Sequence, residues 1–535
     1  ALITLAVYSP TLFAPFNSND DKLLVTYLIN KEGFTWSEHF FPGGRGDYYR
    51  PLILLSYEFD KLAWGLEESF MHLENILLHL LNAVLLYLAA CRLNKIFNLS
   101  LPWLPFAIAA CFALHPVNTE AVNWITSRTD LMATTGVYAA LYGLLVYYGT
   151  GRILPGVLSA FGLAFGALAK EPALFFLPGA LVIIWWSHPK KERLTEYANL
   201  TGKILVSTAY AVVVAGYFLL RWLAFHSDRG VENTLKVLST VEPSAAASEA
   251  LLPMSAVYFK LLLKATGFYF KKIFWPFPLN FATISVAESY LYAGVFVLLL
   301  ICWLLYRRTL LSGIALSSLF IASSALLVIL NPMSWTPVAE RYLYMASGLF
   351  LMPLLFGLVI NREQLFKSTV AVLLVTGILA ASAYGTYSRN IVWQDNVTLF
   401  QDAVEKSPNN KSAKNELALA LIAAGRQEEG YALLDSIQGI KGQLSSLNQV
   451  AVFLRRKQYP EAKRYLLERL EAPGPNQGYI LKTLIKTNQF LIEESAGDDE
   501  LQHGYYMETI NWLNRLKKLT NNPFYSYRLG QTYLV

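Results

Sequence analysis

Apolar stretches long enough to cross a membrane recur through the first 387 positions, with short polar segments between them. A helix crosses the hydrocarbon core with about 20 apolar residues, or with fewer when it is buried in a bundle. The pattern predicts about eleven spans, at 1–16, 72–90, 101–114, 131–149, 153–169, 171–187, 203–224, 289–306, 309–330, 343–360 and 367–387. The expected fold is all-α: a polytopic transmembrane bundle over 1–387, followed by a soluble helical domain over 388–535.

The soluble part has the pattern of helical repeats. Residues 409–438 indicate a helix, a turn at Gly425 and a second helix, with small residues such as Ala418 where helices would meet. About 34 residues further on, the segment around Tyr459 and Ala462 repeats this outline. The period is typical of tetratricopeptide repeats, whose stacked helix pairs form concave surfaces for extended peptides.

The composition also indicates two regions, one embedded in lipid and one exposed to water. Hydrophobic residues make up 54% of the chain and charged residues only 15%, against about 25% in soluble domains. Of the 82 charged residues (44 Lys and Arg plus 38 Asp and Glu), 34 lie in the last 148 positions. This uneven distribution puts the boundary near Tyr387. The three cysteines lie inside apolar runs, which excludes a disulfide scaffold, and the net charge of +6 gives no indication of nucleic-acid binding.

Lys and Arg in the short loops predict the orientation, because cytoplasmic loops carry an excess of both. The basic loops at 92–95, 152, 190–193, 307–308 and 362–367 alternate correctly and are expected in the cytoplasm. The outer side then holds a first loop at 17–71, a loop at 225–288 and everything after Tyr387. Four lysines in 255–280 make a crossing there costly, so we expect an interfacial or re-entrant element. If that segment crossed, the C-terminal region would be cytoplasmic.

Ionisable residues gather on the expected outer side. Asp20 and Asp21 follow the first span and are either a general base or metal ligands, or a solvated helix cap. Arg50 is suited to hold a phosphate by bidentate contacts, or to reach lipid headgroups. His72, Asn75 and His79 share one helix face, where a hydrogen-bonding seam competes with a metal site.

Three further clusters lie at span ends on the same side. The polar stretch after His115 contains Glu120, Arg128 and Asp130, and helical spacing lets it line a cleft or form a surface loop. The turn at Lys170 and Glu171 holds either an internal ion pair or a lysine beside a lipid phosphate. The last cluster places Glu340 and Arg341 at the mouth of a span. No Gly-rich phosphate loop is visible, so a cytoplasmic nucleotide is not the expected donor.

The order of these motifs resembles a known family. NDD, YRPL, HLENILLH, HPVNTEAV with RTDL, LAKE, AERYLY and SPNN, followed by the repeats, is similar to the transmembrane and tetratricopeptide-repeat O-mannosyltransferases. The similarity covers nearly the whole chain. With its compact loops and few repeats, the chain resembles a small, bacterial relative.

The resemblance implies a GT-C glycosyltransferase: a polytopic bundle, a catalytic carboxylate in the first outer loop, and a polyprenyl-phosphate sugar as donor. The matching carboxylates here are Asp20 and Asp21. The expected activity is transfer of mannose or another hexose to Ser or Thr hydroxyls of an exported protein held by the repeats. The expected location is a bacterial inner membrane with the site on the periplasmic side, or the endoplasmic reticulum membrane facing the lumen.

The residues fit an inverting displacement. One of the two aspartates takes the proton of the attacking hydroxyl, while cations stabilise the departing phosphate. Four residues are candidate phosphate ligands: Arg50, Arg128, Lys170 and Arg341. Six are expected to support them: His72, His115, Glu120, Asp130, Glu171 and Glu340. No metal site is assigned and no cofactor is certain, although the aspartates could hold a divalent cation.

Two other functions fit the sequence. A non-enzymatic membrane anchor could present the repeats to an exported partner during assembly. Alternatively, a GT-C enzyme could use a lipid or glycan as acceptor.

Overall fold

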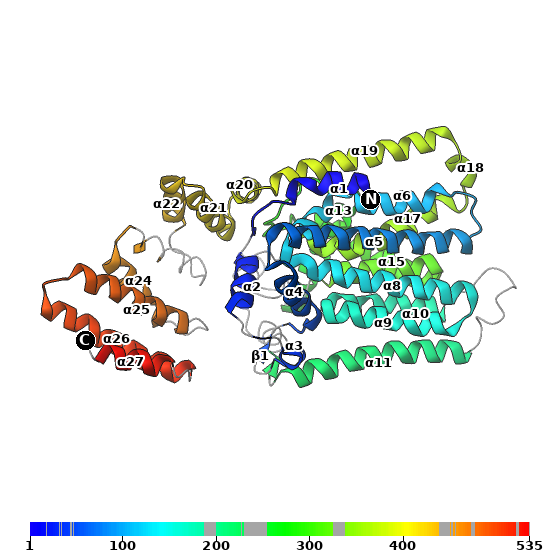
Figure 1. Ribbon diagram of the computed structural model, residues 1–535. Helices are drawn as coiled ribbons and strands as arrows, with labels where there is room; N and C mark the ends of the chain where they lie inside the picture. Colours follow the sequence, from blue (N-terminus) through cyan, green and yellow to red (C-terminus); the bar gives the residue numbers. More distant parts are fainter. Residues whose placement is uncertain are drawn as a thin grey trace. The chain divides into compact units, whose positions relative to one another are not determined.

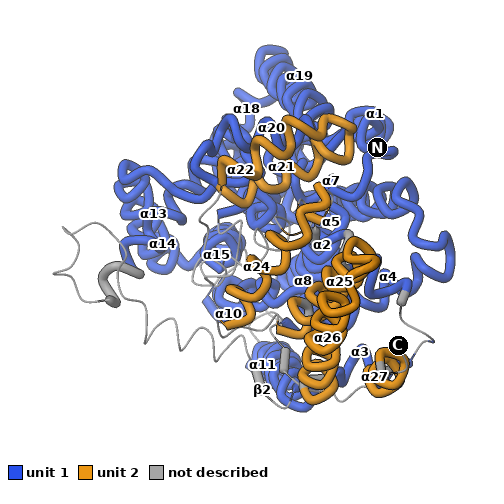
Figure 2. Tube along the Cα trace, turned by 90° about the vertical axis from the view of Figure 1, so that its left-hand side faces the viewer, with its two compact units in different colours: residues 1–410 blue, residues 411–535 orange. Residues whose placement is uncertain are grey.

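The computed structural model divides the chain into two compact units, Ala1–Asn410 and Lys411–Val535, coloured separately in Figure 2. The residues it describes exclude 18, 31–32, 34, 43–44, 47, 187–199, 226, 229–253, 325–337, 438–449, 451–452, 455, 472–476, 521–523 and 534–535. The basic loop at 190–193, the ends of two predicted spans and the first residues of the Glu340 cluster lie outside the described residues.

The first unit is a helix bundle with long apolar members, which confirms the all-α membrane fold. Its longer helices are α5 (Glu68–Ile96), α6 (Trp103–Ala113), α8 (Arg128–Thr150), α9 (Ile153–Ala169), α11 (Leu200–Ala224), α13 (Met254–Phe274), α14 (Tyr290–Arg307), α15 (Leu310–Ser323), α17 (Tyr344–Val359) and α19 (Thr369–Val392). Among the described residues, six helical segments are long and apolar enough to cross a membrane: 68–96, 125–150, 200–224, 290–307, 340–359 and 369–392. The other five predicted spans contain apolar helices of 10–17 residues.

Close helix contacts in the bundle depend on glycine. Helix α8 packs along α9 and α5, and α15 packs between α10 (Leu177–Trp185) and α17 (Figure 1). A Cβ on Gly136 of α8 would overlap the backbone of Gly162 and Gly166 in α9. A Cβ on Gly294 of α14 would likewise overlap the backbone of α13 at Leu263. Small residues let apolar helices approach closely where no hydrophobic effect drives them together.

The predicted first outer loop forms short helices at one end of the bundle. Helices α2 (Asn19–Asn30), α3 (Trp36–Phe40) and α4 (Pro51–Trp64) gather there, and α18 (Glu363–Phe366) lies at the other end (Figure 1). Strand β1 (Arg45–Gly46) pairs in parallel with β2 (Ser227–Asp228), which comes from the predicted loop at 225–288. The tertiary structure therefore joins two loops that are far apart in the sequence.

Several short elements connect the spans at this end. They are η2 (Pro116–Asn118), α7 (Thr119–Asn123), η3 (Ile125–Ser127), η4 (Glu171–Phe176) and η6 (Glu340–Leu343). All five come from polar clusters noted in the sequence. Their residues are buried far more than a surface loop would be, from His115 to Asp130 in particular.

The boundary between the units lies beyond the change in composition at Tyr387. Helix α20 (Asn396–Lys406) and the residues after it belong to the first unit. The Asn280 amide donates to the Ser407 hydroxyl at 2.8 Å, and the Asn410 amide donates to the Ala282 carbonyl at 3.0 Å. Polar composition marks where the chain leaves the apolar bundle, whereas these bonds keep the next 23 residues or so attached to it.

The second unit consists of helices, and its described residues form two apolar clusters. Helices α21 (Lys411–Ala423) and α22 (Gln427–Ser436) pair through a turn at Gly425, whose φ of +84° suits glycine. Ala418 is buried at their contact, as the repeat pattern predicted. Helices α24 (Tyr459–Leu470), α25 (Gln477–Glu494), α26 (Asp499–Thr520) and α27 (Phe524–Tyr533) follow. The first helix expected in the second repeat lies largely outside the described residues.

Candidate active site

The two adjacent aspartates at the start of α2 have different surroundings. The Asp21 carboxylate is fully buried and accepts the backbone N–H of Thr126 at 3.1 Å and of Asn17 at 3.2 Å. Burial raises the pKa of Asp21 to about 7, although both backbone donors oppose this rise. Asp21 therefore ties the loop before α2 to η3.

Asp20, in contrast, reaches solvent. Desolvation by the surrounding protein raises the pKa of its carboxyl, and the positive charge of Arg341 works against that rise. Asp20 is thus a carboxylate that is both accessible and electrostatically coupled to a cation. These are the properties that a general base needs beside an anionic substrate.

Arg341 is held by a buried carboxylate from α7. One Glu120 oxygen pairs with the Arg341 guanidinium, and the other accepts the backbone N–H of Glu340 at 2.9 Å. The guanidinium lies 4.4 Å from the Trp124 ring centroid and 4.8 Å from that of Tyr342. Burial raises the pKa of Glu120, and the Arg341 charge opposes the shift. These contacts fix the direction of the guanidinium before any substrate arrives.

Lys170 approaches the same aromatic ring. Its ammonium lies 5.3 Å from the Tyr342 centroid and donates to both Asp130 oxygens, at 2.7 and 2.6 Å. Burial and the charges of Arg50 and Arg341, only partly offset by Asp130, together lower the pKa of Lys170 to about 8. Lys170 and Arg341 therefore form a cationic pair around Tyr342.

Arg50 is bound to Glu171, with its Nη2 and Nε atoms 2.8 and 3.0 Å from one carboxylate oxygen. The Tyr49 backbone N–H donates to the other oxygen at 3.3 Å, and the Tyr48 ring centroid lies 4.3 Å from the guanidinium. Of the two alternatives for the turn at Lys170 and Glu171, an ion pair between these two residues does not form. Lys170 pairs with Asp130, and Glu171 pairs with Arg50 from the first outer loop.

Arg128 lies apart from this cationic group. Its guanidinium is buried and pairs with Asp60 at 2.7 Å and Glu74 at 2.9 Å. The Arg128 Nε donates to Asn75 at 3.2 Å, and the Tyr57 ring lies 4.7 Å away. Two carboxylates already surround this charge, so its geometry fits a brace between α4, α5 and α8. We do not include Arg128 among the phosphate ligands proposed below.

The histidines form a seam of hydrogen bonds between segments. A His72 ring nitrogen lies 3.1 Å from the Ala14 carbonyl, and His79 contacts the Tyr344 hydroxyl at 2.7 Å and the Ala113 carbonyl at 3.0 Å. A His115 ring nitrogen lies 3.0 Å from the Ile273 carbonyl of α13. This confirms the seam expected from the helix spacing. Within the described part of the chain, no three His, Cys, Asp or Glu side chains group as metal ligands would.

Two features of the site were not expected from the sequence. Tyr342 and Trp124 contribute aromatic faces beside the cations, and Lys272 of α13 pairs with Glu340 at 2.6 Å. Tyr342 directly follows Arg341, so an aromatic residue next to a candidate phosphate ligand was the available signal. The sequence contained no comparable signal for Lys272, because its partner Glu340 is 68 residues away and a lysine in an amphipathic segment is ordinarily solvated.

Fold and site together define an integral membrane protein with buried ion pairs, one of which contains the Arg341 charge that acts on an accessible carboxylate. The chain is similar to "Protein O-mannosyl-transferase TMTC3" of Mus musculus (26% identical over 403 residues) and of Homo sapiens (24% over 408). Each similarity covers 70% of this chain and 42% of the relative, so the chain spans less than half the length of either protein. "Protein O-mannosyl-transferase Tmtc3" of Drosophila melanogaster is 36% identical over 108 residues, which are 17% of this chain and 12% of that protein.

These similarities support the resemblance that the motifs carried, since each of the three similar proteins bears the name of a protein O-mannosyl-transferase of the TMTC type. No family model and no solved structure matches it.

Proposed function

We propose that the chain is a membrane glycosyltransferase that transfers mannose or another hexose to Ser or Thr hydroxyls of a protein. The donor in this proposal is a polyprenyl-phosphate sugar, and the acceptor is an exported polypeptide. The names of the relatives support the sugar and the protein acceptor. The observation that carries the proposal is the accessible Asp20 carboxylate within reach of the Arg341 charge, beside the cationic pair around Tyr342.

Asp20 is the general base in the proposed reaction. The acceptor oxygen forms a bond to the anomeric carbon while the bond from that carbon to the phosphate oxygen breaks. Asp20 takes the hydroxyl proton, and the bonding electrons leave with the polyprenyl phosphate. A single displacement inverts the anomeric centre. A positioned base typically contributes about 10²–10⁴ in rate.

Lys170, Arg341 and Arg50 are the proposed phosphate ligands. Each is held by a carboxylate, from Asp130, Glu120 and Glu171 respectively. Cations fixed in a site with little water stabilise the growing phosphate charge without reorganising. The leaving group is already a stable anion, so this mechanism needs neither a general acid nor a metal ion. The partly exposed ring of Tyr342 adds an apolar surface against which a sugar ring can pack.

The variant Asp20→Asn tests the proposed general base. With a polyprenyl-phosphate mannose donor and a Ser/Thr peptide, Asp20→Asn should lower the transfer rate at least about 100-fold without changing thermal stability. Glu67→Gln is the matched control, because Glu67 is an exposed carboxylate in the same region. Full activity in Asp20→Asn would reject the proposed role. Labelled lipid or glycan product without labelled peptide would replace the protein acceptor, and no product with any acceptor would favour the scaffold function.

A further inference from the structure

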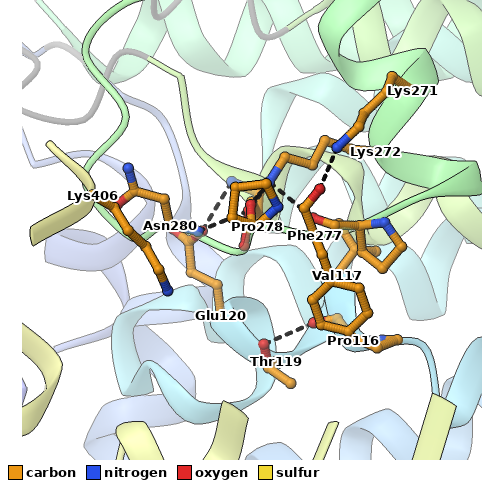
Figure 3. Close-up of polar contacts among 12 residues, drawn as sticks. Pro116, Val117, Thr119, Glu120, Lys271, Lys272, Phe277, Pro278, Asn280 and Lys406 are labelled. Carbon is orange, nitrogen blue, oxygen red and sulfur yellow. Dashed lines mark hydrogen bonds and ion pairs between the residues drawn. The ribbon is translucent and has the colours of Figure 1, made fainter. Parts of the chain in front are cut away.

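A pocket of about 500 Å³ with both polar and apolar lining residues lies at the end of α13, within the first unit. We call it the α13 pocket. Lysines from two distant segments line it, Lys271 and Lys272 from α13 and Lys406 from the end of α20, and the described residues that line it include no carboxylate. In Figure 3 the Asn280 side chain lies between Lys406 and the two lysines of α13.

Hydrogen bonds hold the walls of this pocket in place. The buried Lys272 ammonium donates to the Pro276 carbonyl at 2.9 Å and to Glu340 at 2.6 Å, and it also contacts the Pro278 carbonyl. The Asn280 backbone N–H donates to the same Glu340 oxygen at 3.0 Å. On the opposite wall, the Asn280 amide donates to the Ser407 hydroxyl. The pocket is therefore part of the folded unit and not a gap between loose loops.

The α13 pocket carries an excess of positive charge. Lys272 is balanced by Glu340, and Asp402 pairs with both Lys406, at 2.5 Å, and Arg389, at 2.6 Å. Lys271 donates to the Phe277 carbonyl, which carries no net charge. The three lysines that line the pocket and the neighbouring Arg389, which does not line it, are four cations against two carboxylates, an excess of two positive charges. Burial and the neighbouring Lys272 charge lower the pKa of Lys271. A bound anion would relieve the repulsion between the two ammonium groups.

The position of the pocket indicates a membrane surface. Tyr290, which lines it, is the first residue of the spanning helix α14. Trp275, next to the pocket at the end of α13, is 64% exposed, and Phe274 beside it is 49% exposed. Exposed aromatic side chains at the end of a span are typical of the level of lipid headgroups. Tyr292 and Phe296 on α14 are exposed as well and extend this surface along the span.

We propose that the α13 pocket binds the phosphate of an anionic phospholipid headgroup from the adjacent leaflet. The lysines supply the charge, and Asn280 and Ser407 supply hydrogen-bonding groups of fixed direction. This site goes beyond the proposed glycosyltransferase function and does not depend on it. Glu340 is buried behind the pocket, where it pairs with Lys272, whereas the guanidinium of the next residue pairs with Glu120 in the candidate active site.

Native mass spectrometry of the full chain in detergent tests the proposal, with phosphatidylglycerol or phosphatidylcholine added. The wild type should bind phosphatidylglycerol more tightly. The double variant Lys271→Gln/Lys406→Gln should lose about 25-fold in affinity, at about five-fold per lysine. Lys260→Gln/Lys264→Gln is the matched control, because these two lysines also lie on α13 but pair with Glu288, which precedes α14, and do not line the pocket. Its affinity should stay within about two-fold of the wild type.

Three results would overturn the proposal. They are equal affinity for the two lipids, equal losses in the two double variants, and displacement of phosphatidylglycerol by millimolar inorganic phosphate. The last result would assign the pocket to a soluble phosphate. If the first double variant does not fold, Lys406→Gln alone provides the test, because Lys406 is exposed and an about five-fold loss is then expected.

Discussion

At the level of single residues, burial separates two side chains that are identical and adjacent in the sequence. Asp21 directs its carboxylate to the backbone of Asn17 and Thr126, whereas Asp20 remains accessible. The sequence narrowed the candidate base to this pair but had no means to choose between them. Each residue could equally have capped α2, since caps and catalytic carboxylates use the same residue types.

The raised pKa of Asp20 predicts the acid limb of the pH–rate profile. A base must be ionised to work, so the transfer rate should fall as the pH drops through the pKa of Asp20. Because desolvation raises that pKa, the fall should occur above the ordinary aspartate value of about 3.9. Initial rates between pH 4 and pH 8 measure it. A rate that does not fall down to pH 4 would contradict the prediction.

The buried Asp21 predicts a pH dependence of stability. The folded-state pKa of about 7 lies above the unfolded value of about 3.9, so the folded protein binds a proton that the unfolded chain releases. The resulting stabilisation is complete below about pH 3.9 and is lost as the pH rises through 7. The midpoint of thermal unfolding should therefore rise from pH 8 to pH 5 in the wild type by more than in Asp21→Asn. Parallel curves would show that Asp21 does not titrate in this range.

At the level of elements, glycine positions determine which helices touch. The apolar pattern predicted eleven helices of the bundle, α13 not among them, but it did not predict their neighbours, because a uniformly apolar helix has no distinct buried face. Gly136 identifies the contact between α8 and α9, since only hydrogen fits against the backbone of Gly162 and Gly166. This contact positions Asp130, at the start of α8, beside Lys170, at the end of α9.

Substituting Gly136 should break this contact. Gly136→Ala inserts a methyl group into the backbone of α9, and such overpacking costs about 1–3 kcal/mol of unfolding free energy. Gly216→Ala in α11 is the control, because its added Cβ meets nothing within 4 Å. The control should be neutral or slightly stabilising, since alanine favours helix. Unfolding in detergent measures both variants, and equal stabilities would refute the close packing.

At the level of the whole molecule, the polar clusters predicted at span ends come together from segments far apart in the sequence. The loops around Asp20, Arg50, Glu120, Lys170 and Arg341 interact through the pairs described above. Apolar periodicity predicted the membrane bundle, and the order of motifs predicted the relatives. The side of the membrane on which each unit lies remains a prediction from the basic loops.

Cysteine labelling tests that orientation. In a background with Cys91, Cys111 and Cys302 replaced by Ala, single cysteines would be introduced at three exposed positions: Glu38, Lys367 and Asp499. A membrane-impermeant maleimide should label positions 38 and 499 in intact cells, and position 367 only after permeabilisation. Labelling of 367 but not 499 in intact cells would show that the segment 255–280 crosses the membrane.

The amino-acid sequence by itself determined which region lies in lipid and which in water, and which ionisable side chains are available for a reaction. A run of apolar residues must leave water wherever the chain folds, and a carboxylate or guanidinium keeps its chemistry in any fold. The helices of the bundle, the helical character of the second unit and the set of candidate residues followed from these local properties.

Only the tertiary structure decided which charges meet. Pairing depends on contacts between residues up to 221 positions apart, as in Glu120 with Arg341, and no local pattern records them. Burial assigned Arg128 to a closed network with Asp60 and Glu74, left Asp20 accessible, and joined Lys272 to Glu340. The physical reason is that the cost of burying a charge depends on the partner that packing provides, and packing is a property of the whole fold.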